Sequence, residues 1–158
     1  GLEGEAQVRV GCASDWVATG QLGTIDFLLM DHRGTIYHDD LNATESSLSD
    51  HAIVFADNVL YPGAPLFLHY IDVQGYAIEI HELKEFLRPD LDDWVVICRP
   101  PPTSKRLPMP RSTPPEMRRL SAEVDAISWR SQQGPVDWVA FQERLRPVFY
   151  KWKEDRGL

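Results

Sequence analysis

Short apolar runs bounded by polar residues dominate the first hundred residues of the chain. Residues 6–13 alternate apolar and polar positions, which is typical of a half-buried strand. Residues 24–31 and 51–58 are continuous apolar runs, as expected of strands covered on both faces in an α/β sheet. Residues 75–83 and 92–99 predict two closing strands. Polar segments with sparse apolar positions separate these runs, and the alternation of strand and helix favours parallel pairing with right-handed crossovers.

Two helices are predicted inside this body. Residues 37–49 are polar with few apolar positions, which indicates a helix and its caps. A second helix is expected to begin at Pro65, because proline suits the first helical turn. Residues 1–98 are therefore interpreted as one α/β domain.

Two further segments follow the body. Residues 99–115 hold seven of the twelve prolines, and they predict an extended, polyproline-like arm. The arm is either a spacer or a segment that lies along a neighbour. Residues 116–158 predict a helical tail. Its apolar stripe recurs at steps of three or four residues on one helical face, at Trp138, Phe141, Leu145, Phe149 and Trp152. The stripe either packs on the chain's own body or docks on another protein, since aromatic side chains are good interface anchors.

Charge is distributed unevenly along the chain. The net charge is −8, but residues 1–98 carry −13 and the proline-rich arm carries +4. An acidic body argues against a nucleic-acid partner, which requires a basic stripe, and it accommodates cations well. No apolar run reaches the length of about 18 residues that a transmembrane helix needs. Cys12 and Cys98 lack the spacing of a zinc site or a disulfide framework, so we expect small buried thiols.

The compartment is not determined by the sequence. The chain begins at Gly1 and shows no secretory signal pattern. We therefore expect an intracellular protein, in the cytoplasm or, if a targeting segment has been removed, in an organelle.

Oxygen-bearing side chains end two of the predicted strands. Asp31 ends the run at 24–31, and Asp57 with Asn58 ends the run at 51–58. Ligands of open α/β sheets bind beyond the carboxyl ends of the strands, so neighbouring strands would bring these side chains together. Two carboxylates and an amide suit Mg²⁺ and suit zinc poorly. The alternative is that Asp57 only opens a turn by bonding to its own backbone.

Three stretches of this body resemble the C-terminal part of catechol O-methyltransferase and its relatives. They read "VRVGCASDWV", "IDFLLMDHRGTIY" and "AIVFADNVLYPGAPLFL", and the resemblance covers roughly residues 6–98. It implies a Rossmann-like methyltransferase fold, S-adenosylmethionine as methyl donor, and Mg²⁺ held at Asp31, Asp57 and Asn58. It further implies that a catechol-like hydroxyl is methylated.

The resemblance also implies two contact regions. Gly11 and Asp15 match positions near the donor's adenine, and Pro62 belongs to the wall beside the substrate. Glu85 is the nearest counterpart of the substrate-binding acid.

The chain departs from the family at three places, the first being the substrate-binding acid, for which Glu85 is only the nearest counterpart. The family has a lysine as general base three residues after its first metal-binding Asp, whereas this chain has Gly34. No residue is assigned as the base, and His32 is only the nearest candidate. The glycine-rich turn that holds the donor is absent from the sequence. The expected fold is thus an incomplete doubly wound sheet that lacks the first two strands, because residues 6–13 match the third.

Three functional hypotheses remain open. The chain is the C-terminal portion of a catechol-type, Mg²⁺-dependent O-methyltransferase and inactive alone; or it is a non-catalytic interaction or scaffold subunit of a larger assembly; or it is half of a split enzyme. In each case the unpaired sheet edge must be covered by an upstream segment, another chain, or the tail. The tail helix and the proline-rich arm are the candidate docking elements.

Overall fold

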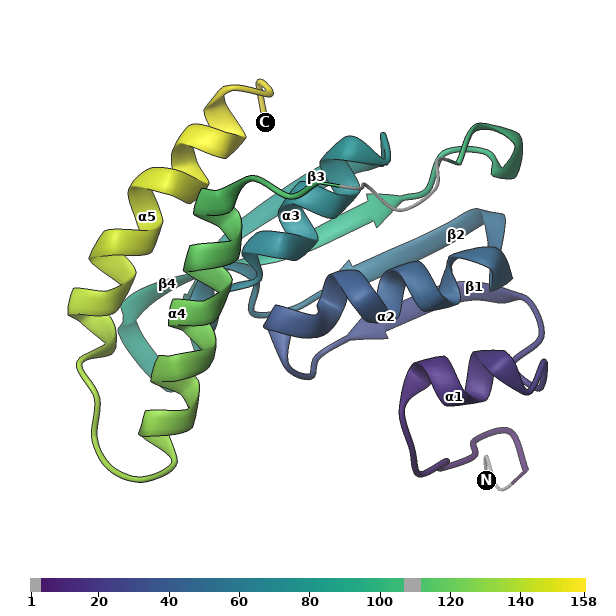
Figure 1. The fold of residues 1–158 in the computed structure, drawn as a ribbon, viewed down its shortest axis with the longest axis horizontal. Helices are drawn as coiled ribbons and strands as arrows, with labels where there is room; N and C mark the ends of the chain where they lie inside the picture. The colour runs from purple at the N-terminus through teal and green to yellow at the C-terminus, as the bar shows by residue number, and fades with distance from the viewer. Residues whose placement is uncertain (1–3, 107–111) are drawn as a thin grey trace.

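The computed structural model describes residues 4–106 and 112–158, and its centre is a four-stranded mixed sheet (Figure 1). The strand order is β1-β2-β4-β3. The strands span Ile25–Met30 (β1), Leu48–Ala56 (β2), Ala77–Glu85 (β3) and Arg88–Arg99 (β4). The chain is thus α/β and compatible with a Rossmann-like fold.

Only one of the three strand pairs is parallel, which corrects the expectation of parallel pairing. β1 and β2 are parallel, whereas β4 is antiparallel to both β2 and β3. The reason is the short β3–β4 connection at Phe86 and Leu87, because a tight hairpin can join only antiparallel strands.

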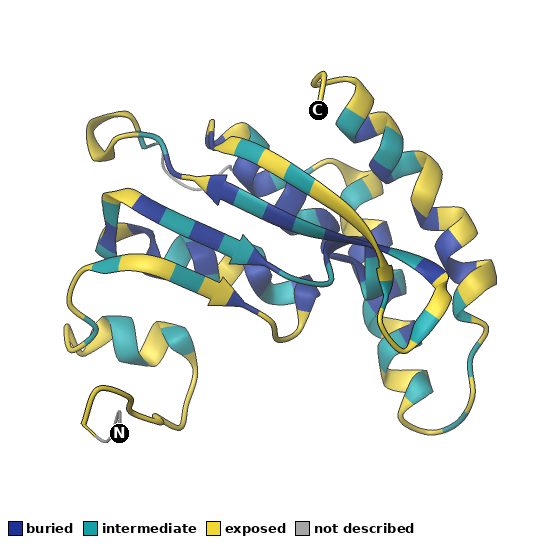
Figure 2. Ribbon diagram, turned by 180° about the vertical axis from the view of Figure 1, so that it is seen from behind, coloured by how far each residue is buried: buried dark blue, intermediate teal, exposed yellow. Residues whose placement is uncertain are grey.

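The long helices cover one face of the sheet, as the views from the front (Figure 1) and from behind (Figure 2) show. They span Tyr37–Thr44 (α2), Pro65–Val73 (α3), Pro115–Ser131 (α4) and Trp138–Glu154 (α5). The short helix α1, Ala13–Ala18, packs beside α2. Short 3₁₀ turns occupy Gly34–Ile36 (η1), Glu45–Ser47 (η2) and Thr103–Lys105 (η4), and a π-helical turn occupies Val59–Gly63 (η3).

The opposite face of the sheet is open within the described part of the chain. On β1, the side chains of Phe27 and Leu29 are 59% and 56% exposed. β1 is also an edge strand, because β2 is its only partner among the described residues. The doubly wound arrangement expected from the sequence, with helices on both faces, is therefore not what these residues form.

Residues 6–13 do not form the strand that their alternation predicts. Val8 and Val10 are 98% and 91% exposed, and α1 begins at Ala13. The backbone carbonyl of Val10 instead accepts a hydrogen bond from the indole of Trp16, at 3.2 Å. Apolar alternation makes a strand only where a neighbouring strand supplies the hydrogen bonds and the packing, and no strand of the described residues pairs with this segment.

The described part of the predicted arm is anchored rather than extended away from the body. Arg106 has a buried side chain that donates to the carbonyl oxygens of Leu48 and Ser49, at 3.1 and 3.2 Å. Thr103 bonds through its amide and its hydroxyl to the carboxylate of Asp50, at 2.9 and 2.7 Å. Residues 107–111 of the predicted arm lie outside the described residues.

The tail packs on the chain's own body. Phe141, Leu145, Phe149 and Trp152 are buried in one core cluster with residues of β2, α3 and β4, and Trp138 is partly buried against it. Gln142 fixes the position of α5 along β4. Its side-chain amide exchanges two hydrogen bonds with the backbone of Asp92, at 2.9 and 2.5 Å. Of the two alternatives for the stripe, the structure shows the intramolecular one, and the four buried residues are not exposed to a partner.

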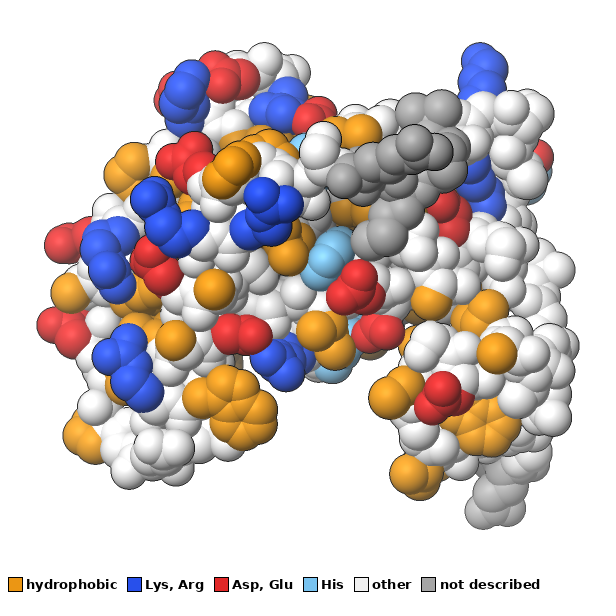
Figure 3. Space-filling model, in the orientation of Figure 1, with side chains coloured by type: hydrophobic (Ala, Val, Ile, Leu, Met, Phe, Trp, Pro, Cys, Tyr) orange, Lys and Arg blue, Asp and Glu red, His pale blue; other side chains and the backbone are white. Residues whose placement is uncertain are grey.

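Surface chemistry adds little that points to a partner. Basic and acidic side chains are interspersed over α4 and α5 (Figure 3). Among the described helices, none combines the length and the apolar character needed to cross a membrane. Cys98 is buried as expected, whereas Cys12 is exposed.

Candidate functional site

The carboxyl ends of β1 and β2 lie side by side. The register pairs Met30 with Ala56, and the amide of Asp57 donates to the carbonyl oxygen of Met30 at 3.0 Å. Asp31 and Asp57 therefore leave the sheet at the same edge. Asp31 is exposed and makes no hydrogen bond or ion pair with another described residue. The structure thus brings together the two acids that sequence reasoning placed at the strand ends.

Asn58 adopts a left-handed backbone conformation immediately after Asp57. Its φ of 55° makes it the one non-glycine residue with positive φ in the described chain. Asparagine tolerates this region better than most residues. The carboxylate of Asp57 accepts the amide of Asn58 at 2.9 Å, so the turn-opening role proposed as the alternative is also present.

Asp93 holds the turn that carries Asn58, and it was missed by sequence reasoning. It is buried in β4, and its Oδ2 accepts the side-chain Nδ2 of Asn58 at 2.8 Å. Its Oδ1 accepts the amides of Leu60 and Tyr61 at 3.2 and 2.9 Å. Because the Asn58 amide nitrogen is bound in this way, its carbonyl oxygen is the end left available for a cation.

A signal for Asp93 was present in the sequence. An acid at the start of the apolar run "WVVIC" occupies a position where burial is costly unless the carboxylate is bonded. The sequence does not show which amides it would bind.

Tyr37 ties the ends of the two strands together from α2. Its hydroxyl is 3.3 Å from the carbonyl oxygen of His32 and 3.2 Å from that of Asp57. Burial raises the pKa of this hydroxyl well above its ordinary value, and the charge of Asp31 adds to the effect. Tyr37 therefore stays neutral at physiological pH and acts as a hydrogen-bonding tie.

Gly34, at the position of the family's lysine, lies against the backbone of the turn η3. A Cβ placed on Gly34 would be 2.9 Å from the carbonyl oxygen of Gly63 and 3.2 Å from the Cβ of Ala64. No side chain fits at this position without movement of that turn. The packing of this turn therefore requires glycine at position 34.

The remaining predicted residues are dispersed. His32 is engaged with Asp40, its Nε2 lying 2.8 Å from the carboxylate. Pro62 lines a cavity of about 340 Å³ between the loop after β1 and α4. Glu85 belongs to the β3–β4 hairpin, where it accepts the amide of Leu87, and it does not line that cavity.

Gly11 and Asp15 lie just before and within α1. No hydrogen bond, ion pair or ring contact in the described chain joins either of them to Asp31, Asp57 or Asn58. The proposed donor-contact residues and the proposed metal ligands thus remain unconnected in this structure.

The metal candidates form an incomplete ligand set. Within residues 4–106 and 112–158, no group of three or more His, Cys, Asp or Glu side chains is placed to hold a metal ion. The triad has only two carboxylates, and its third member is an amide. Hard cations accept such oxygen ligands and complete their coordination with water, so the donor chemistry fits Mg²⁺.

Burial of Asp93 has a consequence for stability. Burial raises the pKa of its carboxyl from 3.8 to about 6, against the opposing effect of the bonds from Tyr61, Trp94 and Asn58. Because the pKa is higher in the folded state, the protonated Asp93 carboxyl stabilises the fold. This contribution is complete below about pH 4 and is lost as the pH rises through 6. The shift in pKa corresponds to about 3 kcal/mol of unfolding free energy.

We expect the free energy of unfolding to fall between pH 4 and pH 6 more steeply in the wild type than in Asp93→Asn. The asparagine keeps an acceptor oxygen but does not titrate. Urea unfolding at pH 4, 5, 6 and 7, without added metal, measures both curves. Parallel curves for the two proteins would contradict the assignment of this carboxyl as the titrating group.

Taken together, the fold and this edge define an α/β protein in which Asp31 and Asp57 follow the carboxyl ends of two neighbouring parallel strands. No family model matches the chain. It is similar to a transmembrane O-methyltransferase homolog of Mus musculus, with 43% identity over 67 residues, or 40% of this chain and 26% of that protein. It is similar to the transmembrane O-methyltransferase of Homo sapiens, with 42% identity over 64 residues, or 39% of this chain and 22% of that protein.

The third relative is the catechol O-methyltransferase of Bos taurus. It is 32% identical over 77 residues, which cover 45% of this chain and 28% of that protein. The chain therefore resembles catechol O-methyltransferase and its transmembrane homologs, as its motifs indicated. The matched region spans about a quarter of the length of these curated relatives.

Proposed function

We propose that the chain is the metal-binding, C-terminal portion of a catechol-type, Mg²⁺-dependent O-methyltransferase, and that it is inactive alone. The observation that carries the proposal is the register of β1 and β2. It brings Asp31 and Asp57 to one sheet edge in a chain that resembles O-methyltransferases.

The chain's own residues have defined roles in this proposal. Asp31, Asp57 and the side-chain carbonyl oxygen of Asn58 would hold the cation, while Asp93 accepts the hydrogen bond of the Asn58 amide nitrogen. When bound, Mg²⁺ supplies Lewis-acid activation and orientation of a substrate hydroxyl. Tyr37 fixes the two strand ends relative to each other, and Pro62 forms a wall of the neighbouring cavity.

Two features support inactivity of the chain alone. The position of the family's base is Gly34, which is packed against Gly63. The glycine-rich turn expected to hold S-adenosylmethionine is absent from the sequence. The donor is therefore expected to bind to an upstream segment or another chain that pairs with the free edge of β1.

Metal binding tests the first part of the proposal. We expect Asp31→Asn and Asp57→Asn each to weaken Mn²⁺ binding at least about tenfold, because each removes one of two carboxylate ligands. Electron paramagnetic resonance of free Mn²⁺ during titration measures the affinity, and competition by Mg²⁺ reports the physiological ion. Asp26→Asn, an exposed acid of β1, is the matched control. Equal weakening by the control would show nonspecific attraction to an acidic surface.

Donor binding tests the second part. Calorimetric titration of S-adenosylmethionine into the chain with Mg²⁺ present is expected to show no binding. Tight binding that Asp57→Ala reduces would contradict the missing donor site and indicate an enzyme that is complete in this chain.

A scaffold subunit is the second candidate, and the open sheet face favours it. Phe27 and Leu29 are exposed on β1, which is an unpaired edge strand. Such an edge can pair with a strand of another chain. A glycine-rich strand–turn–helix upstream in the same reading frame would favour the enzyme. If that motif is carried by a separate polypeptide that co-purifies, the split enzyme is favoured, and a co-purifying protein without the motif favours the scaffold.

A further inference from the structure

A second cavity lies in the tail, where the chain passes from α4 to α5 at the lower left of Figure 1. Its volume is about 660 Å³, within the usual range of small-molecule sites. The end of α4, the loop at 133–137 and the first turns of α5 form its walls. This α4–α5 cavity shares no lining residue with the strand-end site or with the cavity beside Pro62.

Two arginines line the α4–α5 cavity, Arg130 from α4 and Arg144 from α5. Arg130 forms no ion pair with any described residue, and its Nε lies 3.4 Å from the backbone carbonyl oxygen of Ala126. Arg144 is 3.9 Å from a carboxylate oxygen of Glu123, and 63% of its side chain is exposed. Exposed pairs at such distances contribute little. Both guanidiniums therefore retain donors for a ligand.

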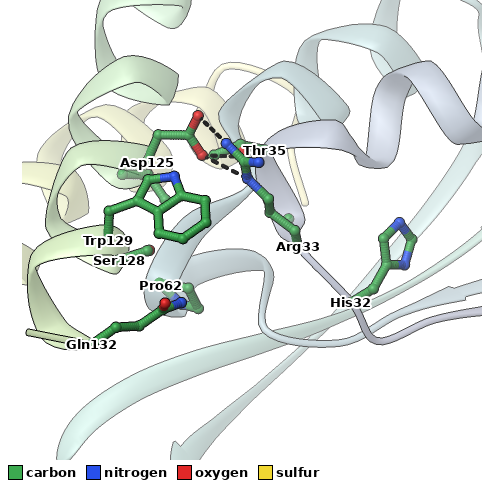
Figure 4. Close-up of a pocket in the computed structure, with 10 residues that line it drawn as sticks. His32, Arg33, Thr35, Pro62, Asp125, Ser128, Trp129 and Gln132 are labelled. Carbon is green, nitrogen blue, oxygen red and sulfur yellow. Dashed lines mark hydrogen bonds and ion pairs between the residues drawn. The ribbon is translucent and has the colours of Figure 1, made fainter.

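The cavity beside Pro62 has a different charge arrangement. Figure 4 shows its arginine, Arg33, bound by Asp125 through two parallel hydrogen bonds, the one from Nε being 3.0 Å long. The α4–α5 cavity has one acid among its described lining residues, Asp137, and its carboxylate caps α5 by accepting the amide of Ala140 at 3.0 Å. Two arginines and one capping acid leave this lining with an excess of positive charge, in a chain whose net charge is −8.

Backbone amides and apolar side chains complete the α4–α5 cavity. The amides of Val136 and Asp137 donate to no described residue. They precede the N-terminus of α5, where the helix dipole favours negative charge. Ile127 and Phe141, which are buried in the core, and Pro135 with Val136 supply the apolar part of the lining. Cationic and amide donors next to apolar surface suit an anion that carries an apolar group.

We propose that the α4–α5 cavity binds a small organic phosphate monoester. The phosphate accepts hydrogen bonds from Arg130 and Arg144, whose planar donor pairs match its geometry, and the apolar group lies against Pro135 and Val136. A monoester carries a charge of about −1.5 to −2 at pH 7 and three acceptor oxygens, so it uses both guanidiniums better than a monocarboxylate does. The tail lies outside the region that resembles the methyltransferases, and the inference goes beyond the proposed function.

Binding is tested by nuclear magnetic resonance of the backbone amides during titration with butyl phosphate, without metal or methyl donor. We expect saturable shifts at Val136 and Asp137, with a dissociation constant of about 1 mM, as is usual for so small a ligand. Thr35, which lines the cavity beside Pro62, should remain unshifted.

Two comparators separate the charge from the apolar group. Inorganic phosphate lacks the apolar group and should bind about tenfold more weakly, and butanol lacks the charge and should show no saturable shift. The absence of saturable shifts with butyl phosphate, or equal binding of either comparator, would overturn the proposal.

Variants of the two arginines locate the site. Arg130→Gln and Arg144→Gln should each weaken butyl phosphate binding about tenfold, because each removes one charged donor pair. Arg118→Gln is the matched control, since Arg118 is an exposed arginine of α4 that forms no ion pair with a described residue and does not line the cavity. It should leave the affinity unchanged. Equal weakening by all three variants would show general attraction of anions to the tail and would overturn the assignment of the site.

Discussion

Phe149→Ala should lower the free energy of unfolding by about 3–5 kcal/mol, the usual cost of truncating a fully buried phenylalanine. Phe149 lies in α5 with no exposed surface, and its ring is 5.9 Å from that of Trp94 in β4. The loss arises because the tail and the sheet share one core. Urea unfolding followed by tryptophan fluorescence measures it.

The matched control is Phe86→Ala in the β3–β4 hairpin, where the ring is 91% exposed. A change within about 0.5 kcal/mol is expected there. If Phe149→Ala were as mild as this control, the tail would be an appendage that folds apart from the body.

Gly34→Lys should destabilise the protein by about 1–3 kcal/mol and should not create a working base. The new Cβ would meet the carbonyl oxygen of Gly63 at 2.9 Å, so the turn η3 that follows Asn58 must move. We therefore expect Mn²⁺ affinity to fall together with stability. Thermal unfolding and Mn²⁺ titration measure the two effects.

Gly134→Lys provides the control for adding a lysine. No atom lies within 4 Å of a Cβ built on Gly134, so this variant should retain wild-type stability and metal affinity. A Gly34→Lys protein as stable as this control would show that the turn yields easily and that the base could be restored in this chain.

Strand prediction succeeded where a segment's own pattern and its surroundings agreed. The continuous apolar run at 24–31 contains β1, and the run at 51–58 covers the second part of β2, which begins earlier, at Leu48. Residues 6–13 also have an apolar pattern typical of a strand, but no described strand pairs with them. The local pattern cannot indicate whether such a partner exists. The antiparallel direction of β4 was likewise concealed, because it depends on the tight turn at Phe86 and Leu87.

The sequence predicted where the two acids of the candidate site lie, but it did not predict the residues that hold the site in place. Asp31 and Asp57 could be placed because they end two strands that proved to be neighbours. Asp93 acts across 35 residues of sequence on Asn58, and Asp125 acts across 92 residues on Arg33. Such pairings depend on tertiary structure, so side-chain type alone does not reveal them. For the same reason, the sequence did not decide whether the aromatic stripe packs on the chain's own body or on a partner.

Because the helices cover only one face of the sheet, association at the open face should have its own heat-capacity change. A chain that completes the sheet at β1 approaches the open face and covers Phe27 and Leu29, without displacing α4 or α5. Burial of that apolar surface gives a negative heat-capacity change. Recognition through the charged outer surface of the tail (Figure 3) would lack this signature. Calorimetry of any partner at several temperatures would therefore identify which side of the molecule it occupies.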